Sequence, residues 1–242
     1  DDFMSSVTHE LRTPLASIRA FSEILHDDPD VELETRRRFL GIIVSETGRL
    51  SRLVNQVLDL AKIESGRAEW LSERVDLSDL INAATEATGQ LFSERGAQVI
   101  CDLPDRPCIV NVDRDRLMQV LVNLLSNAVK FAPPQEGIVR IRLDAGPASC
   151  RVSVADNGPG IAEADQAHIF EKFRQGGGGG EKPMGTGLGL PISREIIERL
   201  GGRIWVDSRS ENGATFTFEL TRLASDDRCV GDGHAKEGPD SG

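Results

Sequence analysis

Two long helical seams fill the first 66 residues and restrict how this chain can fold. Apolar residues recur in steps of three and four, as at positions a and d of a heptad repeat, on either side of Asp27-Asp28-Pro29-Asp30. The first seam consists of Met4, Val7, Leu11, Pro14, Ile18, Phe21 and Leu25, and the second of Phe39, Ile43, Leu50, Leu53, Val57, Leu60 and Ile63. We expect two long helices, the first bent at Pro14 and the second ending near Ser65-Gly66. Because an antiparallel pair leaves part of its seam uncovered, the pattern predicts a homodimeric four-helix bundle.

The heptad register singles out one histidine. With Met4 at position a and Val7 at position d, His9 falls at position f, the most exposed place of the repeat. Glu10 is its neighbour, and Thr13 lies one turn later on the same face as His9. An exposed histidine is often an ordinary surface residue, so this position alone leaves both interpretations open.

From about Val75 the pattern changes to alternating helices and strands. Helices are expected at 77–94, 114–131, 164–170 and 188–200, and strands at 98–102, 108–112, 137–143, 150–155, 203–207 and 214–220. This order predicts a mixed sheet with helices on one face, an α/β sandwich. After Leu223 the sequence is polar and aperiodic. The predicted organisation is therefore a helical hairpin (1–68), an α/β domain (75–222) and a disordered tail or linker (223–242).

The predicted helix 114–131 carries a line of polar residues beside its apolar stripe. Asn123, Asn127 and Lys130 recur at i, i+4 and i+7 and so share one face. Asparagine oxygens suit Mg²⁺, which prefers oxygen ligands and keeps water and substrate phosphates in its shell, and lysine offers a point charge to phosphate. Taken alone, the line fits a solvated helix face equally well.

Glycine is concentrated between residues 156 and 190. This density indicates a backbone that approaches a ligand closely or moves, because glycine enters positive φ freely and has no Cβ. Gly185, Gly187 and Gly189 precede an apolar helical pattern, where the unpaired N–H groups of a helix start can bind an anion. Asp156 ends a strand, and its carboxylate can accept a hydrogen bond from an exocyclic amine such as that of adenine, or else stabilise the turn that follows.

The composition excludes some classes of function. A net charge of −11 and a pI near 4.9 argue against non-specific binding to nucleic acid or to an anionic membrane. No apolar run approaches the roughly 20 residues of a membrane span, and no signal peptide is visible. Because the chain begins without Met inside a helical pattern, we expect it to be part of a longer protein. Cys101, Cys108, Cys150 and Cys229 lack metal-binding or redox spacing, which predicts reduced, mostly buried thiols of a cytosolic protein.

Together these segments resemble the catalytic core of the sensor histidine kinases of two-component systems. That core is a dimerisation and histidine-phosphotransfer domain followed by a GHKL-type (Bergerat-fold) ATP-binding domain, and the resemblance covers residues 2–222. Five segments carry it in the family's order: the H box (6–15), the N box (123–131), the G1 box (156–160), the F box (170–173) and the G2 box (185–190).

For the helical hairpin, the resemblance implies that His9 is the phosphoacceptor, which attacks the γ-phosphate of ATP through Nε2. Glu10 would accept a hydrogen bond from Nδ1–H of His9 and hold the ring in one tautomer. Thr13 would place the water that dephosphorylates the partner response regulator. The exposed face of the hairpin below His9 would bind that regulator.

For the α/β domain, the resemblance implies an ATP site that includes Mg²⁺. Asn127 would bind the metal with support from Asn123, Lys130 would contact phosphate, and Asp156 would recognise adenine in a contact shared with Thr215. The other residues expected at the site are Gly158, Gly160, Phe173, Gly185, Thr186, Gly187, Leu188 and Gly189.

Residues 170–184 look like the family's ATP lid, whose closure would depend on the packing of Phe170 and Phe173. Many relatives carry a basic residue two places after the second phenylalanine of the F box. Here Arg174 comes one place after it and Gln175 two places after it, which leaves open which of them reaches the γ-phosphate.

The activity implied is that of an ATP-dependent protein-histidine kinase, a cytoplasmic homodimer that phosphorylates His9 and passes the phosphoryl group to an aspartate of a response regulator. A GHKL-type ATPase is disfavoured, because those enzymes generally have a carboxylate base where this chain has Asn123, and they lack an H-box hairpin. A nucleotide-binding scaffold without activity would show degraded boxes, and the boxes are intact. The sequence leaves open whether His9 is served by the ATP site of its own chain or of its partner.

Overall fold

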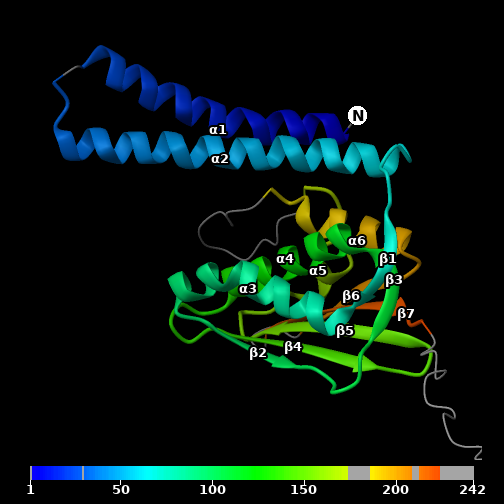
Figure 1. The fold of residues 1–242 in the computed structure, drawn as a ribbon. Coiled ribbons are helices and arrows are strands. Elements are labelled where there is room, and N and C mark those ends of the chain that lie inside the picture. The colour runs from blue at the N-terminus through cyan, green and yellow to red at the C-terminus, as the bar shows by residue number, and fades with distance from the viewer. Residues whose placement is uncertain (1, 29, 174–185, 209–212, 224–242) are drawn as a thin grey trace, which may run out of the picture.

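The computed structural model describes residues 2–28, 30–173, 186–208 and 213–223 (Figure 1). Helices α1 (Asp2–Asp27) and α2 (Leu33–Glu64) form an antiparallel hairpin. Near the turn the rings of Phe21 and Phe39 pack with centroids 4.9 Å apart. The two predicted helices are confirmed, and α1 continues through Pro14 as one helix.

A five-stranded sheet forms the second part of the molecule, with strand order β2-β4-β5-β7-β6. Its strands are β2 (Gln98–Asp102), β4 (Ile138–Ala145), β5 (Ser149–Asp156), β7 (Ala214–Thr221) and β6 (Arg203–Ser208). β2 pairs with β4 in parallel and the other pairs are antiparallel, so the predicted mixed sheet is confirmed. Helices α3 (Leu77–Arg95), α4 (Arg114–Phe131) and α6 (Gly189–Arg199) cover one face (Figure 1).

Strand alternation decides which side chains enter the core. Val152 and Val154 of β5, together with Phe216 and Phe218 of β7, are buried under the helices. The intervening residues point to the opposite, uncovered face, where a shallow hollow of about 420 Å³ is lined by Arg140, Arg142, Asp144, Arg151, Ser153, Ala155, Trp205, Asp207, Thr215 and Thr217.

Two elements differ from the sequence-based expectation. A strand at Ser72–Asp76, β1, pairs with β3 (Ile109–Asp113) in a separate two-stranded sheet. Only Val75 of β1 is buried, so its polar sequence carries no alternating pattern. The helix predicted at 164–170 is reduced to the short α5 (Glu163–Gln166). After it, the amide of His168 donates to the carbonyl oxygen of Asp165 and that of Glu171 to the carbonyl oxygen of His168, a three-residue spacing that is not α-helical.

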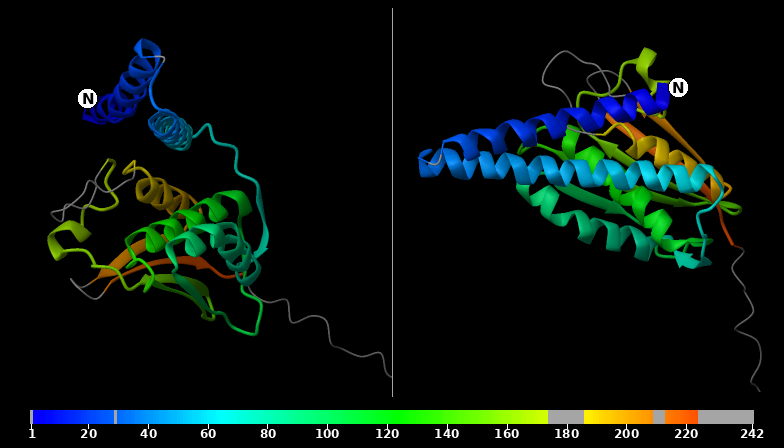
Figure 2. Two further views of the ribbon diagram at one scale, coloured as in Figure 1. Left: turned by 90° about the vertical axis from the view of Figure 1, so that its left-hand side faces the viewer. Right: turned by 90° about the horizontal axis from the view of Figure 1, so that it is seen from above.

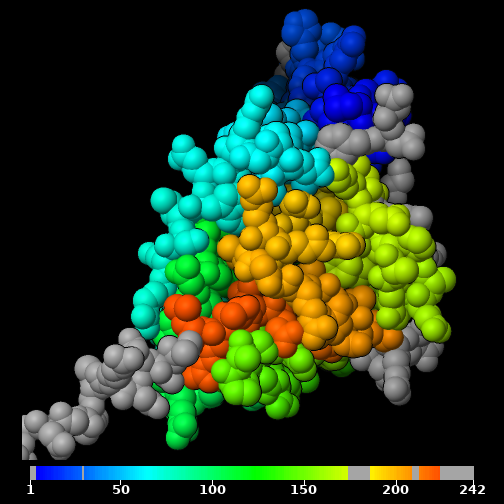
Figure 3. All heavy atoms as spheres, turned by 90° about the vertical axis from the view of Figure 1, so that its right-hand side faces the viewer, coloured from blue at the N-terminus to red at the C-terminus, as the bar shows by residue number. Residues whose placement is uncertain are grey.

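Helix α2 packs into the core of the α/β part. Leu53, Leu60 and Ile63 are at most 2% exposed and belong to the same apolar cluster as the sheet. Beside them Asp59 accepts hydrogen bonds from Arg116 of α4 (2.6 Å) and Gln119 of α4 (2.8 Å). In Figure 3 the cyan end of α2 rests directly on the gold atoms of α6. No helix in the described ranges is both long enough and apolar enough to span a membrane.

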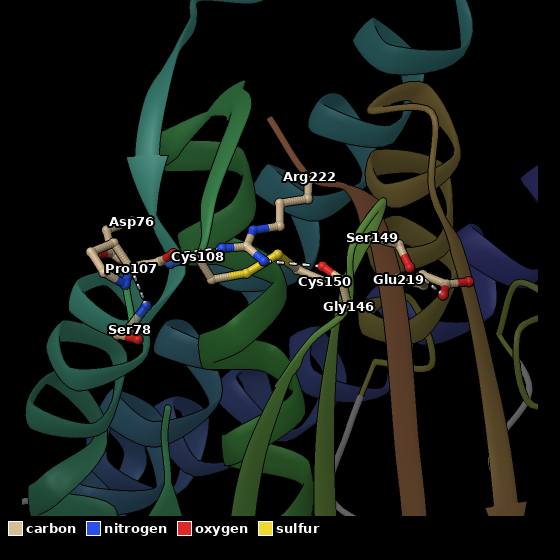
Figure 4. The surroundings of a disulfide bond; sticks show 9 residues. All are labelled: Asp76, Ser78, Pro107, Cys108, Gly146, Ser149, Cys150, Glu219 and Arg222. Atoms are coloured by element: carbon tan, nitrogen blue, oxygen red, sulfur yellow. Dashed lines mark hydrogen bonds between the residues drawn. A yellow bond between two sulfur atoms is a disulfide. The ribbon is translucent and has the colours of Figure 1, made fainter. Parts of the chain in front are cut away.

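The prediction of reduced, mostly buried cysteines is wrong for the redox state of two of them, whereas burial of most of the described cysteines and the free thiol of Cys101 agree with it. Cys108 and Cys150 are fully buried and joined as a disulfide, and Cys101 is an exposed free thiol. The fold brings the start of β3 next to the start of β5, and Arg222 bonds the carbonyl oxygens of Gly146 and Pro107 on either side (Figure 4). A separation of 42 residues leaves no local sequence pattern that reveals the pairing. Cys229 lies outside the described residues.

We expect reduction of this disulfide to lower the free energy of unfolding by about 2–4 kcal/mol, because it removes a cross-link of intermediate loop length from the unfolded chain. Urea denaturation with and without dithiothreitol measures the change. A Cys101→Ser variant, which keeps the cross-link, should retain the full difference, and coincident curves for oxidised and reduced protein would show that the disulfide is not a stabilising element.

Candidate nucleotide-binding site

Helix α4 presents its polar line, defined as Asn123, Asn127 and Lys130, away from the buried stripe that packs on the sheet. Asp113 caps the helix by accepting a hydrogen bond from the amide of Arg116 at 3.0 Å. The side chain of Asn123 donates to Oγ of Ser193 in α6 at 2.9 Å. Within the described residues the side-chain amide of Asn127 has no hydrogen-bond partner. Asn123 therefore ties two helices together, whereas Asn127 is available to a ligand.

Two glycines bracket this polar line. A Cβ placed on Gly158 would lie 2.6 Å from the carbonyl oxygen of Phe131, at the C-terminal end of α4. A Cβ on Gly189, at the start of α6, would lie 2.2 Å from Oδ1 of Asn123. Both distances are shorter than a Cβ normally allows. At Gly158 the opposing atom belongs to the backbone, so that loop requires glycine, whereas at Gly189 the side chain of Asn123 would have to move. The first and last glycine segments thus both contact α4, the first at its C-terminal end and the last beside Asn123.

Asp156 lies at the end of β5, beside the first glycine segment. Its Oδ1 accepts a hydrogen bond from the amide of Gly158 at 2.8 Å. Burial raises the pKa of Asp156, and the amides of Gly158 and Ala214 lower it in part by hydrogen bonding. Gly213 adopts φ +77° and is so close that a Cβ there would lie 1.8 Å from the backbone oxygen of Asp156. The carboxylate is held in a partly buried setting that suits an uncharged hydrogen-bond donor.

Thr215 lies on the uncovered face of the sheet. It pairs with Ala155, and both line the hollow on the uncovered face. Asp156 is one residue further along β5 and so points toward the helices. That Thr215 shares the adenine contact of Asp156, directly or through water, stays a prediction, and the backbone of Gly213 and Ala214 is the neighbour of Asp156 from β7.

Positive charge gathers around Lys130. Burial lowers the pKa of Lys130 most, and the charges of Arg49 and Arg95 lower it further. Arg95 of α3 also donates a hydrogen bond to the backbone oxygen of Lys130 at 3.0 Å. Three cations from three helices meet here, an arrangement that favours a polyanion.

The first residues of the predicted lid are joined to the segment that follows the lid. The amide of Phe173, which has φ +61°, donates to the carbonyl oxygen of Gly187 at 3.0 Å. Thr186 bonds Gln56 of α2 at 2.5 Å, and Leu188 is fully buried as the residue before α6. Phe170 packs edge-on against Phe216, with ring centroids 6.3 Å apart.

Several predicted residues are only partly accounted for. Gly160 is described, with φ +75°, in the turn after Asp156. Gly185, the five-glycine run 176–180, and Arg174 and Gln175 lie outside the described residues. α6 starts at Gly189 without a side-chain cap, so the amides of its first turn remain available to an anion.

His9 is exposed on α1, as predicted from position f. Thr13 donates to the carbonyl oxygen of His9 at 3.4 Å. The carboxylate of Glu10 lies 3.4 Å from the guanidinium of Arg49, in α2, and among the described contacts it is this arginine and not His9 that Glu10 meets. Figure 2 shows the N-terminal half of α1 on the same side of α2 as residues 157–173.

No local sequence pattern distinguishes Arg49, Arg95 or Gln56 as residues of the site. Arg95 is the last residue of α3, where a basic side chain is common, and the other two lie among many polar residues of α2. Arg49 and Gln56 lie on the same helix as Asp59. Their place at the site is recognised only once α2 is known to pack on the α/β part. The nearest sequence signal for Arg49 and Gln56 is that they are polar residues at helical spacing beside the apolar Leu53 and Leu60.

The contact between Gly213 and Asp156 can be tested by substitution with alanine. Gly201 provides a matched control, because it has φ +78° and no atom lies within 4 Å of the position that a Cβ would take there. We expect Gly201→Ala to cost about 1–2 kcal/mol through left-handed strain. Gly213→Ala should cost a further increment of about 1–3 kcal/mol, because the added atom collides with the backbone of Asp156. Thermal unfolding measures both, and equal losses would contradict the close approach.

Comparison with known proteins agrees with this geometry. Residues 1–66 match the His Kinase A (phospho-acceptor) domain family, and residues 112–223 match the family of histidine kinase-, DNA gyrase B- and HSP90-like ATPases. The sensor histidine kinase YcbM of Bacillus subtilis is 31% identical over 221 residues, which are 91% of this chain and 71% of that protein. The chain spans about a third of the length of several other curated relatives, 36% in one case.

Two solved structures are also similar. Full-length ShkA in complex with AMPPNP is 30% identical with a TM-score of 0.68, over 91% of this chain and 46% of that one. The histidine kinase ThkA in complex with the response regulator protein TrrA is 29% identical with a TM-score of 0.71, over 92% of this chain and 62% of that one. Fold, order of segments and relatives agree, and the chain belongs to the sensor histidine kinase family.

Proposed function

We propose that this chain is the catalytic core of an ATP-dependent protein-histidine kinase, which phosphorylates His9 and passes the phosphoryl group to an aspartate of a response regulator. The observation that carries this proposal is that both glycine segments contact α4, Gly189 beside Asn123 of the polar line and Gly158 at the carbonyl oxygen of Phe131, where the helix ends. ShkA, a relative of similar fold, binds AMPPNP, and ThkA binds a response regulator. These two complexes support the same substrate and the same class of partner for this chain.

In the proposed complex Asp156 accepts a hydrogen bond from the exocyclic amine of adenine. Lys130 meets the phosphates, as do the amides at the start of α6, around Gly187 and Gly189. Gly158 and Gly160 allow the nucleotide to approach the backbone, while Phe173, Thr186 and Leu188 shape the base of the lid. Gly185 is expected to act with its two neighbours, although it lies outside the described residues.

Asn127 is the residue best suited to hold Mg²⁺. Its amide has no hydrogen-bond partner within the described residues, and a single neutral oxygen ligand fits an ion that takes its other ligands from water and phosphates. The ion would neutralise charge on the phosphates. Asn123 is already bonded to Ser193, so we assign it to holding α6 and Asn127 in register.

The transfer requires no group beyond His9 as nucleophile. The lone pair of Nε2 forms a bond to the γ-phosphorus while the bond from phosphorus to the β,γ-bridging oxygen breaks, and ADP leaves with that electron pair. The ring, substituted at both nitrogens, is positively charged until the proton on Nδ1 is released. We assign Glu10 to stabilise this ring.

We propose a homodimer formed through the hairpin, with the α/β unit (75–222) attached to the helical unit (1–68). The hairpin exposes large apolar side chains that a soluble monomer rarely leaves in such number along two helices: Met4, Leu15, Ile24, Leu33, Leu40, Val44, Val54 and Leu58. A second copy covers them in a four-helix bundle. The core would act in the cytoplasm, where its ATP is found, and the response regulator would dock on the hairpin below His9.

Incubation with γ-labelled ATP and Mg²⁺ tests the proposal. We expect acid-labile, alkali-stable label on the wild-type chain and at least a 100-fold loss, about the limit of such an assay, in His9→Gln, because the substitution removes the nucleophile. Nucleotide affinity should be unchanged in this variant, since His9 lies on α1. Binding without label would favour a non-enzymatic scaffold, and phosphate release without label would favour an ATPase.

The spacing of Thr13 after His9 motivates a second activity, dephosphorylation of the regulator. We expect Thr13→Ala to lower the rate of regulator dephosphorylation about 10- to 100-fold, because the hydroxyl that places the attacking water is lost. Autophosphorylation should persist, and Thr13→Ser, which keeps the hydroxyl, serves as the control. If Thr13→Ala dephosphorylates the regulator at the wild-type rate, this role is excluded.

A further inference from the structure

Arg49 of α2 lies where three parts of the molecule meet. One guanidinium nitrogen is 3.4 Å from Oε2 of Glu10, the residue after His9, and the other is 3.8 Å from Oε2 of Glu46. All three side chains are about one quarter exposed. The arginine therefore links the two helices of the hairpin immediately beside the proposed phosphoacceptor.

The packing of α2 on α4 places the same arginine over the polar line. Asp59 is anchored to Arg116 near the start of α4. The ten residues from Asp59 back to Arg49 span about 15 Å of helix. Helix α4 runs antiparallel to α2 (Figure 1), so about 15 Å along α4 from Arg116 reaches the turn that contains Asn127. Arg49 is therefore expected opposite that turn. The effect of the Arg49 charge on Lys130 agrees with this register.

We propose that Arg49 is a positioning residue of the phosphoryl transfer, which holds Glu10 between His9 and the polar line of α4 and so commits the transfer to a single chain. This inference rests on the proposed kinase function. Arg49 is paired with Glu10 and its charge acts on Lys130, and the N-terminal half of α1, which carries His9, lies on the side of its own residues 157–173 (Figure 2).

The charges explain why an arginine is needed here. Glu10 and Glu46 are two negative groups beside the path of a triphosphate, and Arg49, Lys130 and Arg95 are three positive ones. Without Arg49 the two carboxylates are unbalanced and oppose the approach of the bound γ-phosphate to His9. Glu10 would also lose the contact that fixes its orientation next to His9.

Kinetics of autophosphorylation test this role. We expect Arg49→Ala to lower kcat about 10- to 100-fold while KM for ATP changes less than about threefold, because the nucleotide is held by the α/β part and only its approach to His9 is impaired. Arg49→Lys should recover part of the rate, since it restores the charge but not the two guanidinium nitrogens that face Glu10 and Glu46. Arg37→Ala, an exposed arginine of the same helix, is the matched control.

A double-mutant cycle separates this role from a general loss of packing. If Arg49 acts through Glu10, Arg49→Ala combined with Glu10→Gln is little slower than Glu10→Gln alone. Fully additive losses, or a wild-type rate for Arg49→Ala, overturn the inference while leaving the kinase function intact. Absence of His9-dependent label on the wild-type chain would instead refute the proposed function.

Mixed dimers test the restriction to one chain. A chain with Asp156→Ala, which keeps His9, is paired with a chain carrying His9→Gln, which keeps the nucleotide site. We expect no label above background, and label on the Asp156→Ala chain would overturn transfer within one chain. Wild type paired with His9→Gln must stay labelled on the wild-type chain, which shows that mixed dimers are competent.

Discussion

The structure depends on the burial of one side of α2 in the core of the α/β part. Leu53, Leu60 and Ile63 join the apolar cluster that also contains the sheet, so the C-terminal part of the helix serves two packing units at once. The ion pair of Asp59 with Arg116 lies beside this contact and fixes how far α2 can slide along α4. The position of α2 along α4 therefore also sets where its side chains reach the nucleotide site. Gln56 bonds Thr186, and the charge of Arg49 acts on Lys130.

Helix α4 has a comparable double role. Its apolar stripe, with Leu121 and Leu125 fully buried, supports the sheet, and its polar line forms the floor of the site. Because the two faces belong to one rigid element, the stability of the core also fixes the position of Asn127 and Lys130. The first glycine segment reaches the backbone of this helix because Gly158 lacks a Cβ, and Gly189 leaves room for the side chain of Asn123.

Sequence patterns predicted the elements that periodicity controls. The bounds of α4 and β2 agree with the expectation, because each has a regular apolar pattern between clear turn signals. What failed depends on partners distant in the sequence. β1 is defined by pairing with β3, and the disulfide by the meeting of two strand starts. The contact of Glu10 with Arg49, 39 residues away, belongs to the same class.

The site also carries two charges that the fold itself disfavours. Burial raises the pKa of Asp156 and, with its cationic neighbours, lowers the pKa of Lys130. Above the ordinary pKa of aspartate, folding is opposed by the buried carboxylate, and this cost disappears as the pH falls below that value. Below the ordinary pKa of lysine, folding is opposed by the buried ammonium, and this cost disappears only as the pH rises above that value. Both groups are therefore destabilised in their charged forms near neutral pH. A ligand with an amine at one end and phosphates at the other stabilises the charged forms of both Asp156 and Lys130. Part of its binding energy therefore comes from compensating the cost of burying these two charges.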